Sequence, residues 1–112
     1  MLVTKRNGSK VEFEPEKIYL AVIRAAREVY AEDDSLREQM KDVTSQILAE
    51  IHETDAESIT ISMVQSIVEQ KLIANGYLKI AERYIAYRLQ RDIDRYFNPD
   101  TMLVHLHFEK LR

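Results

Sequence analysis

The sequence contains no cysteine and no tryptophan, and it has only two glycines and two prolines among 112 residues. The absence of cysteine excludes disulfide bonds, zinc sites built on thiolates and a cysteine nucleophile. Because the two glycines stand far apart, at positions 8 and 76, neither a GxxxxGK[ST] loop nor a GxGxxG turn can form, and these are the usual backbone cradles for phosphate groups. Any phosphate-binding site in this chain must therefore be built from side chains.

Long hydrophobic runs are also absent, since no apolar stretch approaches the roughly 20 residues that a bilayer requires. The N-terminal segment carries Lys5 and Arg6 but no apolar core, so it does not resemble a secretory signal. The composition is 46% hydrophobic and 31% charged, which is typical of one soluble globular domain. We expect a cytoplasmic protein that does not contact a membrane.

The net charge of −3 is unevenly distributed. Residues 1–24 carry +2, residues 25–58 carry −7 and residues 59–112 carry +2. The acidic middle argues against binding to duplex DNA, which favours a continuous basic face, so we expect no nucleic-acid partner. The two basic ends, in contrast, could meet in space around a small anion.

The first half of the sequence predicts a β-hairpin and two helices. The hairpin spans residues 2–13, because Asn7-Gly8 is a strong signal for a type I′ turn between short segments with strand character. Pro15 then opens a helix that we expect to run to about Tyr30. Ser35 and Glu38 form a capping box for a second helix, and the acidic segment 52–58 reads as a loop.

The second half predicts two more helices. Ser62 and Gln65 form a capping box for the third, Gly76 ends it, and the fourth runs from about Tyr77 to Tyr96. Residues 100–112 fit either a short helix or a strand. The apolar positions at helical spacing should face the core: Ile18, Ala21, Val22, Ala25, Ala26, Val29, Leu36, Met40, Val43, Ile47, Ile51, Met63, Val64, Ile67, Val68, Leu72, Ile80, Ala81, Tyr84, Ile85, Leu89 and Ile93. The predicted fold is α+β, with an N-terminal hairpin or small sheet capping a four-helix bundle.

No constellation of residues indicates catalysis. His105 and His107 would share a strand face and His52 lies in an acidic segment, but no nearby third ligand supports a metal site. The serines occupy predicted caps, turns and helix surfaces without a GxSxG elbow. We therefore expect neither a catalytic residue nor a metal site made of protein side chains alone.

The opening segment VTKRNGSKVEFEPEKI is the most informative part of the sequence. Lys5 and Arg6 precede the turn, and Phe13, Lys17 and Ile18 follow it. Cations beside an aromatic and an aliphatic residue suit a triphosphate attached to a purine. Strand alternation would send Lys5 and Arg6 to opposite faces, so at most one of them should easily join Phe13. The alternative is an exposed hairpin whose lysines are simply solvated.

These residues resemble the signature of the ATP-cone, the nucleotide-sensing domain usually found at the N-terminus of ribonucleotide reductase subunits. Two later segments resemble the family as well, namely Ile59 to Gln65 and Ala81 to Arg91, so the resemblance covers residues 2–97. The opening matches at consecutive motif positions: Val3, Lys5, Arg6, Asn7, Gly8, Phe13, Lys17 and Ile18.

The resemblance implies roles for individual residues. Lys5, Arg6 and Lys17 would contact phosphates, and Phe13, Ile18 and Val22 would border the base. Gln65 would lie near the nucleotide, and Tyr87 and Arg91 would line the same pocket, with Arg83 and Lys71 as weaker candidates. The implied nucleotide-binding set is Val3, Lys5, Arg6, Asn7, Gly8, Phe13, Lys17, Ile18, Val22, Gln65, Tyr87 and Arg91. Mg²⁺ would be bound through the phosphates.

The resemblance also implies a function. Residues 1–97 would bind ATP as an activator or dATP as an inhibitor of a ribonucleotide reductase. The domain would act through oligomerisation with other cones and with reductase subunits. It would thereby regulate deoxyribonucleotide synthesis for DNA replication. Residues 98–112 would be a tail or a linker toward a catalytic or radical subunit. Two alternatives stay open: a nucleotide-sensing part of a regulator of reductase genes, which in this family follows a zinc ribbon that the chain lacks, and a helical interaction domain without a ligand.

Overall fold

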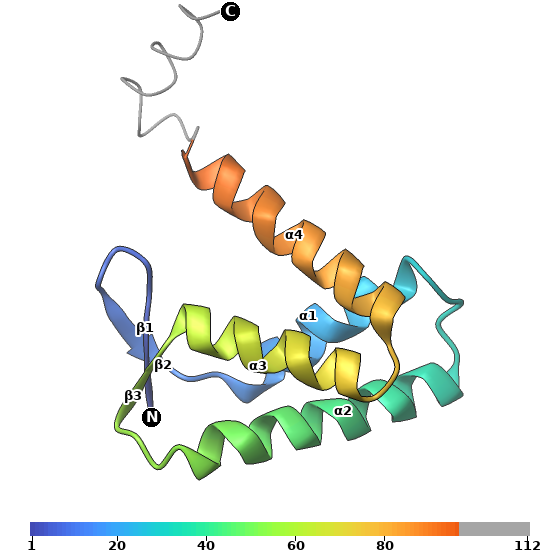
Figure 1. Ribbon diagram of the computed structural model, residues 1–112, viewed down its shortest axis with the longest axis horizontal. Coiled ribbons are helices and arrows are strands. Elements are labelled where there is room, and N and C mark those ends of the chain that lie inside the picture. The colour runs from blue at the N-terminus through green and yellow to red at the C-terminus, as the bar shows by residue number, and fades with distance from the viewer. Residues whose placement is uncertain (97–112) are drawn as a thin grey trace, which may run out of the picture.

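A computed structural model describes residues 1–96, and these form a small sheet and four helices (Figure 1). The predicted α+β architecture is confirmed. The predicted tail 98–112, with His105 and His107, lies outside the described residues. In chain order the elements are β1 (Leu2–Thr4), β2 (Lys10–Glu12), α1 (Pro15–Arg27), α2 (Asp34–Glu53), β3 (Ser58–Thr60), α3 (Ile61–Ala74) and α4 (Leu78–Tyr96).

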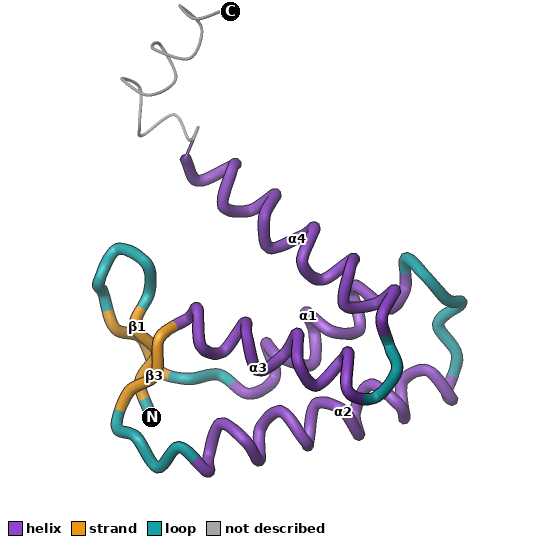
Figure 2. The backbone as a smooth tube through the Cα atoms, viewed as in Figure 1, coloured by secondary structure: helices purple, strands orange, loops and turns teal. Residues whose placement is uncertain are grey.

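The sheet has the strand order β2-β1-β3 and gathers at one end of the molecule (Figure 2). β1 pairs antiparallel with β2, placing Val3 opposite Val11, and parallel with β3, placing Val3 opposite Ile59. The predicted hairpin is confirmed, but its turn is not of type I′, because Gly8 has a left-handed φ of 87° whereas Asn7 does not have a positive φ. The third strand was not predicted, because the sequence interpretation placed a loop up to residue 58 and a helix cap at Ser62, with no strand between them.

The helix ends differ from the prediction in three places. α1 ends at Arg27 instead of about Tyr30, although the Tyr30 amide still donates to the Ala26 carbonyl oxygen at 2.9 Å. Asp33 caps α2 by accepting a hydrogen bond from the Leu36 amide at 2.8 Å. The predicted cap at Ser35 is therefore wrong. The same residue types that cap helices occur in succession here, and the sequence does not say which one leaves the helical conformation.

The start of α3 shows a similar shift. Thr60, not Ser62, is the cap, and its hydroxyl accepts from the Met63 amide at 3.1 Å. The helix begins earlier than predicted because β3 ends at Thr60 and α3 starts at the next residue, Ile61. At the other end the prediction is confirmed: Gly76 follows α3 with φ 85°, and the Tyr77 amide donates to the Leu72 carbonyl oxygen at 2.8 Å.

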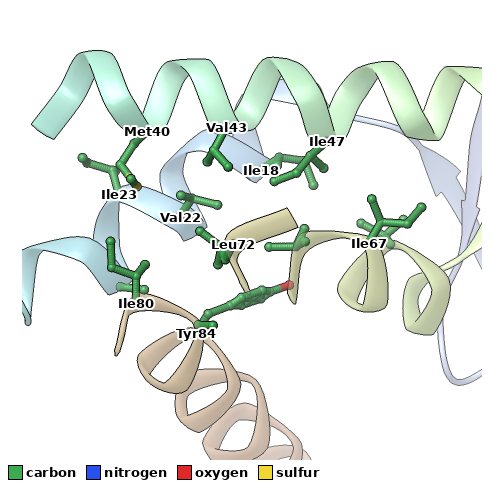
Figure 3. Packing of buried hydrophobic residues seen from close by; sticks show 14 of the residues in the cluster. Ile18, Val22, Ile23, Met40, Val43, Ile47, Ile67, Leu72, Ile80 and Tyr84 are labelled. Carbon is green, nitrogen blue, oxygen red and sulfur yellow. The ribbon is translucent and has the colours of Figure 1, made fainter. Parts of the chain in front are cut away.

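The hydrophobic core lies between α1, α2, α3 and the first half of α4 (Figure 3). Val22, Met40, Ile47, Leu72 and Ile80 are completely buried, and each comes from the predicted inward face of its helix. The inward prediction fails for Met63, which is 51% exposed, because the buried face of α3 begins at Val64 and Gln65 instead.

The second half of α4 leaves the core. Among residues 78–94 of this helix, Tyr84 is the last buried one, and burial raises the pKa of this phenol to about 12. Leu89 and Ile93, predicted to face inward, are each 50% exposed, because α4 extends past the other helices (Figure 1). Within residues 1–96 no helix is long and apolar enough to cross a membrane.

Candidate functional site

A cleft of about 390 Å³ lies where the hairpin, the start of α1 and the start of α3 meet. Its volume falls within the range of about 300–1,000 Å³ that is typical of ligand pockets. The lining combines an apolar surface with charged side chains from the hairpin and α1: Val3, Lys5, Arg6, Val11, Glu12, Phe13, Glu14, Lys17, Ile18, Ile61 and Val64.

Lys5 and Arg6 both line this cleft, contrary to the expectation that strand alternation would separate them. The reason is that β1 ends at Thr4, so both cations belong to the turn and not to the strand. The Lys5 amide donates to the Ser9 carbonyl oxygen at 2.8 Å, which closes the turn just beyond the strand. Together with Lys17 they give the cleft three cations against the carboxylates of Glu12 and Glu14.

Arg6 connects the hairpin to two helices. Its Nη2 donates to Oε1 of Gln65 on α3 at 3.1 Å and lies 3.2 Å from Oδ2 of Asp92 on α4. Gln65 is only 9% exposed, so its amide is a buried acceptor that fixes the guanidinium. Sequence reasoning missed Asp92, because an isolated acid on a polar helix face carries no signal of a partner far away in the chain.

Lys17 and Phe13 are held by more local contacts. The Lys17 Nζ lies 2.8 Å from Oε2 of Glu14, and both side chains are largely exposed. Phe13 is half-buried and meets the ring of His52 edge to face, with centroids 6.4 Å apart. The aromatic side of the cleft is thus supported by the end of α2.

Asn7 and Gly8, the next two of the predicted site residues, shape the turn without lining the cleft. The Asn7 Oδ1 accepts hydrogen bonds from the Ser9 amide at 3.0 Å and from the Ser9 hydroxyl at 2.7 Å. Val22 is completely buried in the core and has no surface in the cleft.

Tyr87 and Arg91 line a separate depression of about 50 Å³ between α1 and α4. The guanidinium of Arg24 lies 4.4 Å from the centroid of the Tyr87 ring, and the Tyr87 hydroxyl donates to Glu28. The weaker candidates also lie elsewhere: Arg83 pairs with Glu28 at 3.8 Å and Lys71 pairs with Glu50 at 3.4 Å. The structure therefore does not bring these α4 and α3 side chains into the cleft.

Another depression, of about 410 Å³, lies at the end of the molecule opposite the sheet (Figure 1). No lysine or arginine is among its lining residues, which are Tyr30, Ala31, Asp33, Ser35, Leu36, Gln39 and Tyr77. Although it is similar in size, it lacks the cations that an anionic ligand needs, and we regard the cleft at the hairpin as the candidate site.

Residues 1–93 match the family described as the ATP cone domain. The chain belongs to the ATP-cone family. The cone is 38% identical over 93 residues to an anaerobic ribonucleoside-triphosphate reductase of Haemophilus influenzae, and 34% identical over 93 residues to that of Escherichia coli. It is 32% identical over 101 residues to the ribonucleoside-diphosphate reductase subunit alpha of Chlamydia trachomatis.

Each of these matches covers 83% of the cone but only 10–13% of the relative. The chain thus spans about an eighth or less of the reductases that it matches. Family membership supports a nucleotide-binding regulatory domain.

The residues present in this cone fit a nucleoside triphosphate. Lys5, Arg6 and Lys17 would supply the charge that phosphates need, and Phe13 and Ile18 would supply an apolar surface for a base. Among residues 1–96, no three histidine or acidic side chains cluster as metal ligands. A magnesium ion at this cleft would therefore be held mainly by the phosphates that accompany it.

Proposed function

We propose that this cone binds ATP or dATP, with Mg²⁺ on the phosphates, in the cleft between the hairpin, α1 and α3. The observation that carries the proposal is the convergence of Lys5, Arg6 and Lys17 on one cleft that also has an apolar wall. The family match covers all the elements that form this cleft.

In this proposal Lys5, Arg6 and Lys17 contact the phosphates. Arg6 is the best prepared of them, because Gln65 holds its guanidinium through a buried amide. Its planar fork suits two phosphate oxygens at once, whereas Lys5 and Lys17 act as point charges. Phe13 and Ile18 border the base, and Phe13 is steadied by His52.

The regulatory role is proposed from the relatives, which are named as ribonucleotide reductases. ATP in the cone would raise the activity of such an enzyme and dATP would lower it. The two nucleotides differ by one ribose hydroxyl, so the response requires a small difference in packing to be converted into a change of surface. We propose that the exposed helices provide that surface and that dATP favours association of cones or of the subunits that carry them.

Titration calorimetry with ATP, dATP and adenosine tests the binding proposal. We expect the two triphosphates to bind far more tightly than adenosine, and Arg6→Ala to weaken dATP binding about tenfold or more, the effect of losing one charge-assisted hydrogen bond. The matched control is Arg37→Ala, which removes a cation from the opposite end of the molecule, where Arg37 pairs with Glu32 and Asp34.

Unchanged dATP affinity in the Arg6 variant would contradict the assignment of the cleft. Equal and negligible heats for all three compounds with the unmodified chain would instead support the ligand-free interaction domain.

A further inference from the structure

Arg6 serves the candidate cleft and helix α4 at the same time. It lines the cleft, yet its Nη2 also lies 3.2 Å from Oδ2 of Asp92. The Arg6 side chain is 45% exposed and that of Asp92 is 27% exposed, so the pair is accessible to an incoming anion. The cation assigned to a phosphate thus already has a carboxylate partner.

This pair differs from the other ion pair at the cleft. Lys17 lies in the first turn of α1 and Glu14 is the residue that precedes the helix, so their separation would displace no other element. Arg6 and Asp92, in contrast, join the hairpin to the far part of α4. Breaking the Arg6–Asp92 contact changes what holds a helix in place.

The second half of α4 has few other attachments. Leu89 and Ile93 are half exposed, and Arg88 is tied to Glu69 of α3 at 2.7 Å. One turn further along, Asp92 is the only residue of 89–94 whose side chain forms an ion pair or hydrogen bond with another element among the described residues. Within residues 1–94, the contact with Arg6 is therefore the last polar contact along α4 that connects this helix to another element.

We propose that Asp92 competes with the nucleotide phosphates for Arg6, so that nucleotide binding releases the last turns of α4. The proposal rests on the proposed function and names its means of regulation. A triphosphate bound to Arg6 supplies a stronger anionic partner and repels the Asp92 carboxylate. Coupling between two binding equilibria is reciprocal. If the nucleotide weakens the Arg6–Asp92 contact by a given factor, that contact weakens nucleotide binding by the same factor.

Asp92→Asn tests the competition by calorimetry with MgATP on the full chain. Removing the carboxylate charge should lower the Kd for ATP about two- to fivefold, the range expected for a partly exposed ion pair. Asp94→Asn is the matched control, since it makes the same charge change two residues away, where Asp94 accepts a hydrogen bond from Gln90 within α4. An unchanged or raised Kd in the Asp92 variant, or an equal decrease in both variants, would overturn the proposal.

Hydrogen exchange of the α4 amides tests the release itself. In the unmodified chain, saturating MgATP should speed exchange at residues 89–94, whereas in Asp92→Asn exchange should already be fast and ATP should add little. Asp94→Asn should behave like the unmodified chain. If the chain binds ATP but ATP does not change the exchange rates, the proposed release of α4 is wrong and the proposed function is unaffected. If the unmodified chain does not bind ATP, both the release of α4 and the proposed function are wrong.

Discussion

At the residue scale, the candidate site depends on where a three-residue strand stops. The sequence predicted the cations and the aromatic residue, but alternation suggested that Lys5 and Arg6 point apart. In the structure both line the cleft, because β1 ends at Thr4 and the turn carries them. A difference of two residues in the strand end decides whether Lys5 and Arg6 alternate, and such ends are set by pairing with other strands, not by local propensity.

Gln65 provides a prediction at the same scale. If it acts by fixing Arg6, Gln65→Leu should weaken dATP binding several-fold, because the guanidinium loses its buried acceptor. Calorimetry on the two single variants and on Arg6→Ala with Gln65→Leu measures the coupling. The double variant should bind little more weakly than Arg6→Ala alone; fully additive losses would show that Gln65 contacts the nucleotide independently.

At the element scale, the helices were predictable and the third strand was not. Helices α1 to α3 carry several apolar residues at helical spacing, and this pattern identified Val22, Met40, Ile47 and Leu72 as core residues. β3 has only three residues and exists because it pairs with β1, which is distant in the chain. The same limit applies to α4: its pattern predicts an inward face, but the sequence does not show where the neighbouring helices end.

The junction between α1 and α2 gives a prediction for acid stability. The pKa of Glu32 lies below its ordinary value of 4.5, chiefly because Arg27 and then Arg37 donate hydrogen bonds to it, and Arg37 lowers the pKa of Asp34 below 3.8. Since the folded chain binds these protons more weakly than the unfolded chain, the stabilisation is present above those ordinary values and is lost as the pH falls through the lowered ones.

The melting temperature, followed by circular dichroism, should therefore fall less between pH 7 and pH 3 in Arg37→Ala than in the unmodified chain. Lys79→Ala, an exposed cation on the first turn of α4, is the control and should keep the full loss. An Arg37 variant as acid-sensitive as the unmodified chain would show that the exposed ion pairs contribute nothing measurable.

At the scale of the whole molecule, charge and shape separate two regions. Three cations of residues 1–24 line the cleft, and one of them, Arg6, also meets Gln65 of α3 and Asp92 of α4. Residues 25–58, which carry −7, include the end of α1, the following loop, all of α2 and the loop that leads to β3. The sequence indicated this division, but the position of α4 relative to the hairpin needed the structure.

The proposed regulation predicts a change of assembly. Light scattering of the isolated chain, and of any reductase that carries it, should show a larger mass with dATP than with ATP. A change restricted to the parent enzyme would place part of the contact outside these 112 residues. Equal masses with both nucleotides in both samples would refute control by oligomerisation.

The central claim is that a nucleoside triphosphate binds at the hairpin cleft, and amide chemical-shift mapping by NMR during an ATP titration tests it most directly. The account predicts that the largest shifts fall on residues 3–18 and 61–65, with smaller shifts in α4 near Asp92. Shifts concentrated around Tyr30, Gln39 and Tyr77, at the opposite end of the molecule, would contradict the account, and so would a spectrum unchanged by ATP.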